Sequence, residues 1–210
     1  MRRTGAALIA AAVFSGRPDF SSFSPKIELG AAFAQGKGPG VAAWVKEGGA
    51  RELADGDENV RLNAAWKIRY AVEEGADVSP ALAGLVKALV DPNASVKGYA
   101  AFALEFHYLL KREWTKAAAL LNHKDNEIRS QSSWALGAAA EKKADLSRFL
   151  KELGKALSND NEFVRWNAAK ALALHHLGKG ARAKAERLAA SDNDDVRQGA
   201  EEALRIYRPR

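Results

Sequence analysis

The chain has 210 residues, enough for one domain or one short repeat array, with 47% hydrophobic and 28% charged residues. It contains no cysteine, which excludes disulfides, thiolate catalysis and cysteine-ligated metal sites. The net charge is +6, but half of this excess lies in the first 40 residues and the other bases are interleaved with acids. This distribution favours a mixed-charge surface over a nucleic-acid interface.

Residues 1–36 have the composition of a targeting segment. Arg2 and Arg3 precede an apolar run, and Ala32-Phe33-Ala34 is a small-x-small pattern before a Gly/Pro-rich spacer. An export signal or an organellar transit segment is indicated, and an extension that stays attached is the alternative. We therefore expect the protein in the periplasm, a plastid, the thylakoid lumen or a mitochondrion, with the cytoplasm as the alternative. No run reaches the roughly 18 apolar residues of a membrane helix.

From residue 37 onward, short and long helical segments alternate. The short ones carry apolar residues at i, i+3 and i+7, and they are expected at residues 41–54, 80–90, 112–121, 145–157 and 181–190. Gly48-Gly49 should weaken the first of them. No segment has the alternation of a strand.

The long segments are copies of one motif: "DENVRLNAAWKI" from Asp57, "NASVKGYAAFAL" from Asn93, "DNEIRSQSSWAL" from Asp125, "NEFVRWNAAKAL" from Asn161 and "NDDVRQGAEEAL" from Asn193. Their basic residues are 36, 32, 36 and 32 positions apart, and the first two copies match the next two at an offset of 68. This is a duplicated pair of repeats. Each copy begins with Asp or Asn, which predicts a helix N-cap. Apolar and small residues then recur at the same positions in every copy, which predicts one packed helix face.

We therefore predict an all-α repeat domain over residues 37–210, made of about five helix pairs. The expected repeats are residues 39–74, 78–110, 111–141, 144–178 and 180–207.

A leucine-rich helix, an Asp/Asn turn and then V-R-x-x-A-A-x-A-L resembles a HEAT repeat, in the short form of phycobilin-lyase-like HEAT proteins. The resemblance covers roughly residues 41–207. It implies a right-handed α-solenoid in which the second helix of each pair lines the concave side. It also implies a structural ladder in which basic residues brace neighbouring turns: Arg61, Lys97, Arg129, Arg165 and Arg197.

Projection of the second helices at 100° per residue places aromatic residues opposite the packed side. The members of this aromatic row are Trp66, Tyr70, Tyr99, Phe102, Phe106, Trp134 and Trp166. Exposed apolar patches rich in aromatics are typical of interaction sites, so a binding groove is predicted. The alternative is that these rings are packing residues.

The leading functional hypothesis is a non-catalytic scaffold, adaptor or complex subunit that binds a protein segment in this groove. A bilin lyase-like, tetrapyrrole-handling protein is the alternative that the resemblance implies. Nucleic-acid binding is a third, less favoured because the groove offers few bases, mainly Arg69, Lys170 and Arg205. No cofactor is expected. No metal site is expected either, because His175-His176 lacks the i, i+4 spacing that places two ligands on one helix face.

Overall fold

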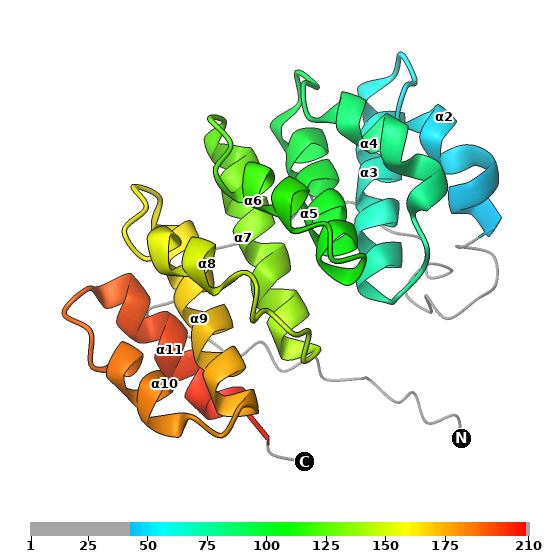
Figure 1. The fold of residues 1–210 in the computed structure, drawn as a ribbon. Helices are drawn as coiled ribbons and strands as arrows, with labels where there is room; N and C mark the ends of the chain where they lie inside the picture. Colours follow the sequence, from blue (N-terminus) through cyan, green and yellow to red (C-terminus); the bar gives the residue numbers. More distant parts are fainter. Residues whose placement is uncertain (1–42, 209–210) are drawn as a thin grey trace, which may run out of the picture.

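The computed structural model describes residues 43–208. Within this range it contains ten α-helices, one π-helical turn, one 3-10 turn and no strand. Figure 1 shows how the helices are arranged. The predicted segment at residues 1–36 lies outside the described residues, so its targeting role stays a prediction. None of the described helices is both long and apolar enough to cross a membrane.

The long segments form five helices, here called the second helices: α3 (Glu58–Glu73), α5 (Ala94–Leu110), α7 (Asn126–Glu141), α9 (Glu162–Gly178) and α11 (Asp194–Ile206). Each begins after the predicted Asp or Asn, whose side chain accepts hydrogen bonds from backbone N–H groups of the first turn. These caps satisfy donors that have no partner inside the helix.

The short segments form the first helices: α4 (Leu82–Ala88), α6 (Trp114–Leu121), α8 (Leu150–Ala156) and α10 (Arg182–Ala189). A 3-10 turn, η3 (Ser79–Ala81), leads into α4. In the first pair a π-helical turn, η2 (Val45–Gly49), precedes a three-residue α2 (Ala50–Glu52). The expected weakness at Gly48-Gly49 is thus a change of helix type, in which the Trp44 indole packs close to both glycines.

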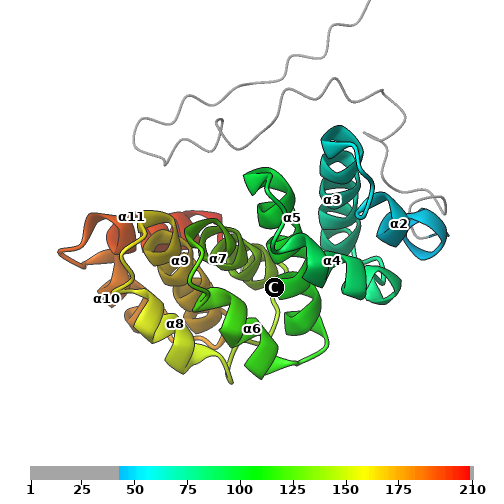
Figure 2. The same cartoon turned by 90° about the horizontal axis from the view of Figure 1, so that it is seen from above.

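The second helices lie side by side in one layer, and α4, α6, α8 and α10 form the other layer (Figure 2). Each second helix has a small residue three positions after its basic ladder residue, and all five are fully buried: Ala64, Ala100, Ser132, Ala168 and Ala200. Glycine permits the closest approach, because a Cβ on Gly199 of α11 would lie 2.2 Å from the carbonyl oxygen of Trp166 in α9. The architecture is therefore an all-α solenoid of five helix pairs, as the sequence predicts.

The 68-residue duplication extends to the helix ends. The residues after the C-caps of α3, α5, α7 and α9 all have positive φ: Gly75, Arg112, Lys143 and Gly180. Gly75 and Lys143 occupy equivalent positions in the two units, and so do Arg112 and Gly180. In this left-handed conformation, N–H groups that follow the helix can donate to its last carbonyl oxygens, so the helix ends there. Glycine adopts the conformation at the least energetic cost.

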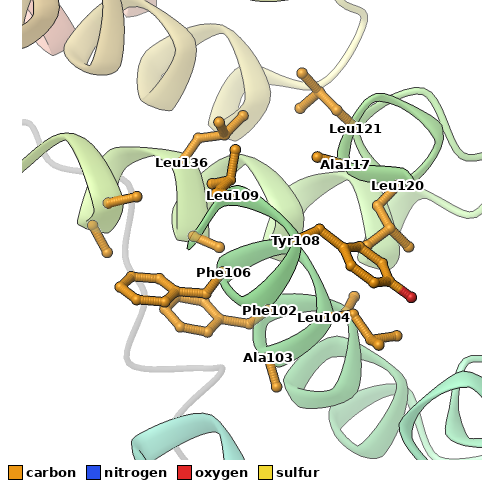
Figure 3. Close-up of a cluster of buried hydrophobic side chains, with 14 of the residues drawn as sticks. Phe102, Ala103, Leu104, Phe106, Tyr108, Leu109, Ala117, Leu120, Leu121 and Leu136 are labelled. Atoms are coloured by element: carbon orange, nitrogen blue, oxygen red, sulfur yellow. The ribbon is translucent and has the colours of Figure 1, made fainter. Parts of the chain in front are cut away.

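The centre of the core is α5, in which every residue from Gly98 to Leu109 is buried. Leu104 and Tyr108 point toward Ala117 and Leu120 of α6, whereas the rings of Phe102 and Phe106 stack on the other side of the helix (Figure 3). We call this other side, which faces away from the first helices, the second-helix face.

Candidate functional site

The aromatic row is a connected set of rings on the second-helix face. Trp66 stacks on Tyr70 within α3 at 5.9 Å between centroids, and Phe102 stacks on Phe106 within α5 at the same distance. The edge of Trp134 from α7 meets Phe102 at 5.5 Å and 78°. Because residues four positions apart share a helix face, each helix presents its rings in pairs.

Two cations from neighbouring helices lie over these rings. The guanidinium carbon of Arg69 in α3 is 4.2 Å from the centroid of Trp134, 4.5 Å from that of Phe102 and 6.0 Å from that of Tyr99. The ammonium of Lys142, after α7, lies 5.9 Å from the Phe106 ring and donates to the carbonyl oxygen of Glu73 at the end of α3. These are cation–π contacts between aromatic faces and partly desolvated cations.

Both contacts join α3 to α7 across α5, so side chains of the first and third pairs meet over the second. Side chains from α3 and from the end of α7 therefore cover the second-helix face at α5. We call Arg69, Lys142 and the rings that they cover the cation clasp.

The expectation of an open aromatic groove is wrong for four of the seven rings. Phe102, Phe106, Tyr99 and Trp166 are 0%, 2%, 4% and 8% exposed, and only Trp66, Tyr70 and Trp134 are partly exposed. The physical reason is that ring stacking and the clasp cover α5, while Lys170 lies 5.0 Å over the Trp166 ring and pairs with Glu141. A helical projection shows direction but cannot show what neighbouring repeats place on top.

The burial of the charged Arg69 side chain costs free energy. Burial lowers the pKa of its guanidinium, and Glu73 at 3.6 Å opposes that shift. Its buried Nε has no hydrogen-bond acceptor among the described residues. Burial and the nearby Glu127 raise the pKa of Tyr99, which Arg69 partly offsets. The clasp thus places a desolvated cation among rings at the centre of the second-helix face.

The basic ladder lies away from these rings, at the turns between first and second helices. Arg61 binds Asp91 at 2.7 Å, Lys97 binds Asp125 at 2.6 Å and Arg129 binds Asp160 at 3.1 Å, each acid belonging to the next pair. Arg165 pairs in the same way with Asp195, while Arg197 in the last pair binds Asp194 of its own helix.

All four arginines of the ladder also donate to backbone carbonyls in the turn before their own helix. Each arginine of the ladder therefore ties a turn to its helix. Four of the five ladder residues, Lys97 included, pair with an acid of the following pair.

No group of three or more His, Asp or Glu side chains that could hold a metal occurs in the part of the chain that the structure describes. His107 is buried and His175 half-buried, and desolvation lowers the pKa of both imidazoles.

Two charged residues of this region were not assigned to the site from the sequence. Lys142 follows the end of α7 and has no repeat-based signal. Glu105 lies eight positions after Lys97, the same register that holds Arg69 in the first pair. The sequence signal that could have pointed to Glu105 is that two adjacent repeats both carry a charged residue eight positions after the ladder residue.

The geometry places the chain in the class of all-α repeat solenoids. Residues 115–205 match the family model described as HEAT repeats, which covers the chain from α6 to α11. The match does not distinguish the phycobilin-lyase-like subclass. Among curated proteins, none matches this chain.

The chain is similar to solved structures of designed or engineered proteins, of which the first supports the same fold. The crystal structure of an engineered protein is 20% identical over 79% of this chain and 78% of its own, with a TM-score of 0.51. A designed armadillo repeat protein in complex with the peptide (KR)4 is 21% identical over 79% of this chain and 89% of its own, with a TM-score of 0.49. At this identity the likeness concerns the fold alone.

Proposed function

We propose that the protein is a non-catalytic interaction module whose second-helix face binds a segment of a partner protein. The contact centres on the three partly exposed rings: Trp66 and Tyr70 beside the cation clasp, and Trp134, which belongs to it. The observation that carries the proposal is the Trp66–Tyr70 stack next to Arg69, because large rings and arginine are the residues that dominate interface energies.

The solenoid architecture supports this function. Stacked helix pairs create an extended surface that a partner chain can follow over several repeats. The rings are preorganised by stacking and cation–π contacts, so little side-chain entropy is lost when a partner binds. The tetrapyrrole-handling and nucleic-acid-binding alternatives make different demands on the same face, and the experiment below separates them.

Site-specific photo-crosslinking tests the proposal. The full chain carries p-benzoylphenylalanine in place of Tyr70, or in place of Val90, which is 84% exposed in the turn after α4. After irradiation in extract of the native source, we expect a discrete protein adduct from position 70 and none from position 90. Trp66→Ala in the position-70 protein should remove the adduct.

The matched control is Trp114→Ala, which removes a partly buried tryptophan from the other layer and should keep the adduct. Circular dichroism checks that both variants stay helical. Equal adducts at positions 70 and 90, or an adduct that survives Trp66→Ala, would overturn the proposal. Visible absorbance in the purified protein would favour tetrapyrrole handling, and steeply salt-dependent DNA binding would favour a nucleic-acid function.

A further inference from the structure

A second feature, independent of the aromatic row, lies at the C-terminal end of the array. The ends of α7 and α9, the start of α10 and residues 206–208 line an open hollow of about 1020 Å³. This volume is close to the upper end for small-molecule sites. The neighbouring elements α9, α10 and α11 pack on one another beside it (Figure 1).

The hollow lies where the second helix is short. Helix α11 has 13 residues, whereas the other second helices have 16 or 17. It ends at Ile206, and Ile206, Tyr207 and Arg208 line the hollow on this side.

The walls combine apolar and cationic side chains. Leu174 and Leu177 are buried apolar residues of the wall, and Ile206 at the end of α11 also lines it. The basic residues that line it are Lys143, Lys179, Arg182 and Arg208, against the acids Glu141 and Asp145. Both acids already have cationic partners, Lys170 for Glu141 and Lys179 for Asp145.

The internal duplication supplies a matched comparison, because each wall residue has a counterpart 68 positions earlier. Four counterparts are larger and apolar: Val72 for Ala140, Phe106 for Leu174, Leu110 for Gly178 and Trp114 for Arg182. Three others are alanines, Ala138 for Ile206, Ala139 for Tyr207 and Ala140 for Arg208. Phe106 is buried and stacked on Phe102. Leu110, in contrast, is 52% exposed, and Trp114 lies next to Phe149. The clearest difference in packing between the two units is therefore Phe106 against Leu174.

The charge changes in the same comparison. The first-unit counterparts comprise two acids, Glu73 and Asp77, and two bases, Lys111 and Arg112. The second unit keeps two acids but has four bases. The second unit therefore has two more bases than the first at these positions, although Lys179 pairs with Asp145 and Arg182 with Glu186.

We propose that this hollow binds a small molecule of metabolite size through a phosphate or carboxylate group. Arg and Lys side chains recognise such anions by charge-assisted hydrogen bonds. The apolar wall of Leu174, Leu177 and Ile206 lowers the local dielectric, which strengthens these contacts and accommodates the uncharged part of the ligand.

His175 reports on occupancy because it lies in the wall. Desolvation lowers the pKa of its imidazole, Asp145 raises it, and Lys179 and Lys184 lower it further. A bound anion favours the imidazolium form, so it raises the pKa of His175. The counterpart His107 is buried in the first unit and serves as an internal reference.

The experiment is an NMR titration of the full chain with pyrophosphate and, separately, with citrate, each against sodium chloride at equal ionic strength. We expect saturable shifts of the Gly178 and Gly180 amide signals and a raised pKa of His175, with His107 unchanged. Stronger binding of pyrophosphate assigns a phosphate ligand, and stronger binding of citrate assigns a carboxylate ligand.

Two glycine substitutions at positive φ form a matched pair of variants. Lys143→Gly installs the residue of the first unit, removes one wall cation and keeps the backbone angle, so the fold is retained. It should weaken binding by about threefold to fivefold, the effect of one lost ion pair of an exposed lysine. Arg112→Gly removes a cation in the same conformation away from the hollow and should leave binding unchanged.

Equal weakening by Lys143→Gly and Arg112→Gly would mean unspecific charge attraction and would overturn the proposal. The absence of saturable shifts at Gly178 and Gly180 with both anions would overturn it as well.

Discussion

Glu105 is an acidic residue without exposed surface in the middle of α5. Neither of its carboxyl oxygens has a hydrogen-bond partner among the described residues, and burial raises its pKa well above the ordinary value of 4.5. A carboxyl group in such surroundings is favoured in its protonated, neutral form. Its position on α5 is thus compatible with packing only while it stays uncharged.

The pH dependence of Glu105 follows from this raised pKa. In the folded chain the group keeps its proton at a pH where the unfolded chain has lost it, so stability falls as pH rises above about 4.5, by about 1.4 kcal/mol per pH unit, until Glu105 ionises in the folded state. Glu105→Gln removes this loss. We expect the stability advantage of Glu105→Gln to be larger at pH 7.5 than at pH 5 in urea denaturation.

Glu105→Leu should show the same pH trend, because it also removes the ionisable group. An advantage that is equal at both pH values would contradict the assignment.

At the scale of elements, the two helix classes differ in how they begin. The second helices have side-chain caps, whereas α4, α6, α8 and α10 have none. The cap of α9 is Asn161, whose Oδ1 accepts from the N–H of Val164 at 3.1 Å. This difference follows from sequence, because only the second helices are preceded by the conserved pattern of Asp or Asn in all five copies.

Asn161→Ala should destabilise the protein by about 1 kcal/mol, because it leaves N–H groups of the first turn of α9 without their acceptor. Thermal denaturation followed by circular dichroism measures the change. The control is Asn122→Ala at the C-cap of α6, where the side chain caps no helix N-terminus, and it should cost less. Equal losses would show that the cap of α9 contributes nothing particular.

At the scale of the whole molecule, the cation clasp departs from the usual behaviour of repeat arrays. In a solenoid each repeat contacts only its neighbours, and stability is a sum of nearest-neighbour terms. Here Arg69 in the first pair contacts Trp134 in the third, and Lys142 returns to Glu73. The clasp therefore couples the first and third pairs directly.

A double-mutant cycle between Arg69→Met and Trp134→Leu measures this coupling. We expect an interaction energy of about 0.5–2 kcal/mol, the range of cation–π contacts between exposed and desolvated sites. The control cycle pairs Arg69→Met with Trp114→Leu, which lies in the other layer, and should be additive. Additivity in the first cycle would refute the coupling.

Asn161 and Phe102 show which features of this protein can be predicted from the sequence and which cannot. The cap, the helix pairs and the repeat period follow from local chemistry and from the recurrence of one motif, so they could be predicted. Phe102 has an outward direction by the same projection, yet it is buried, because Arg69 and Trp134 arrive from pairs before and after it.

The sequence by itself therefore determined the all-α class, the five helix pairs and the N-caps of the second helices, since all of these depend on interactions within one repeat or between adjacent ones. Only the tertiary structure decided which aromatic rings stay partly exposed, where the cation clasp closes and where the array leaves a hollow. The exposure of the rings and the position of the clasp depend on contacts between repeats that are not adjacent, such as that of Arg69 with Trp134, which the periodicity of a single helix does not encode. The hollow depends on how the ends of α7, α9 and α11 lie relative to one another.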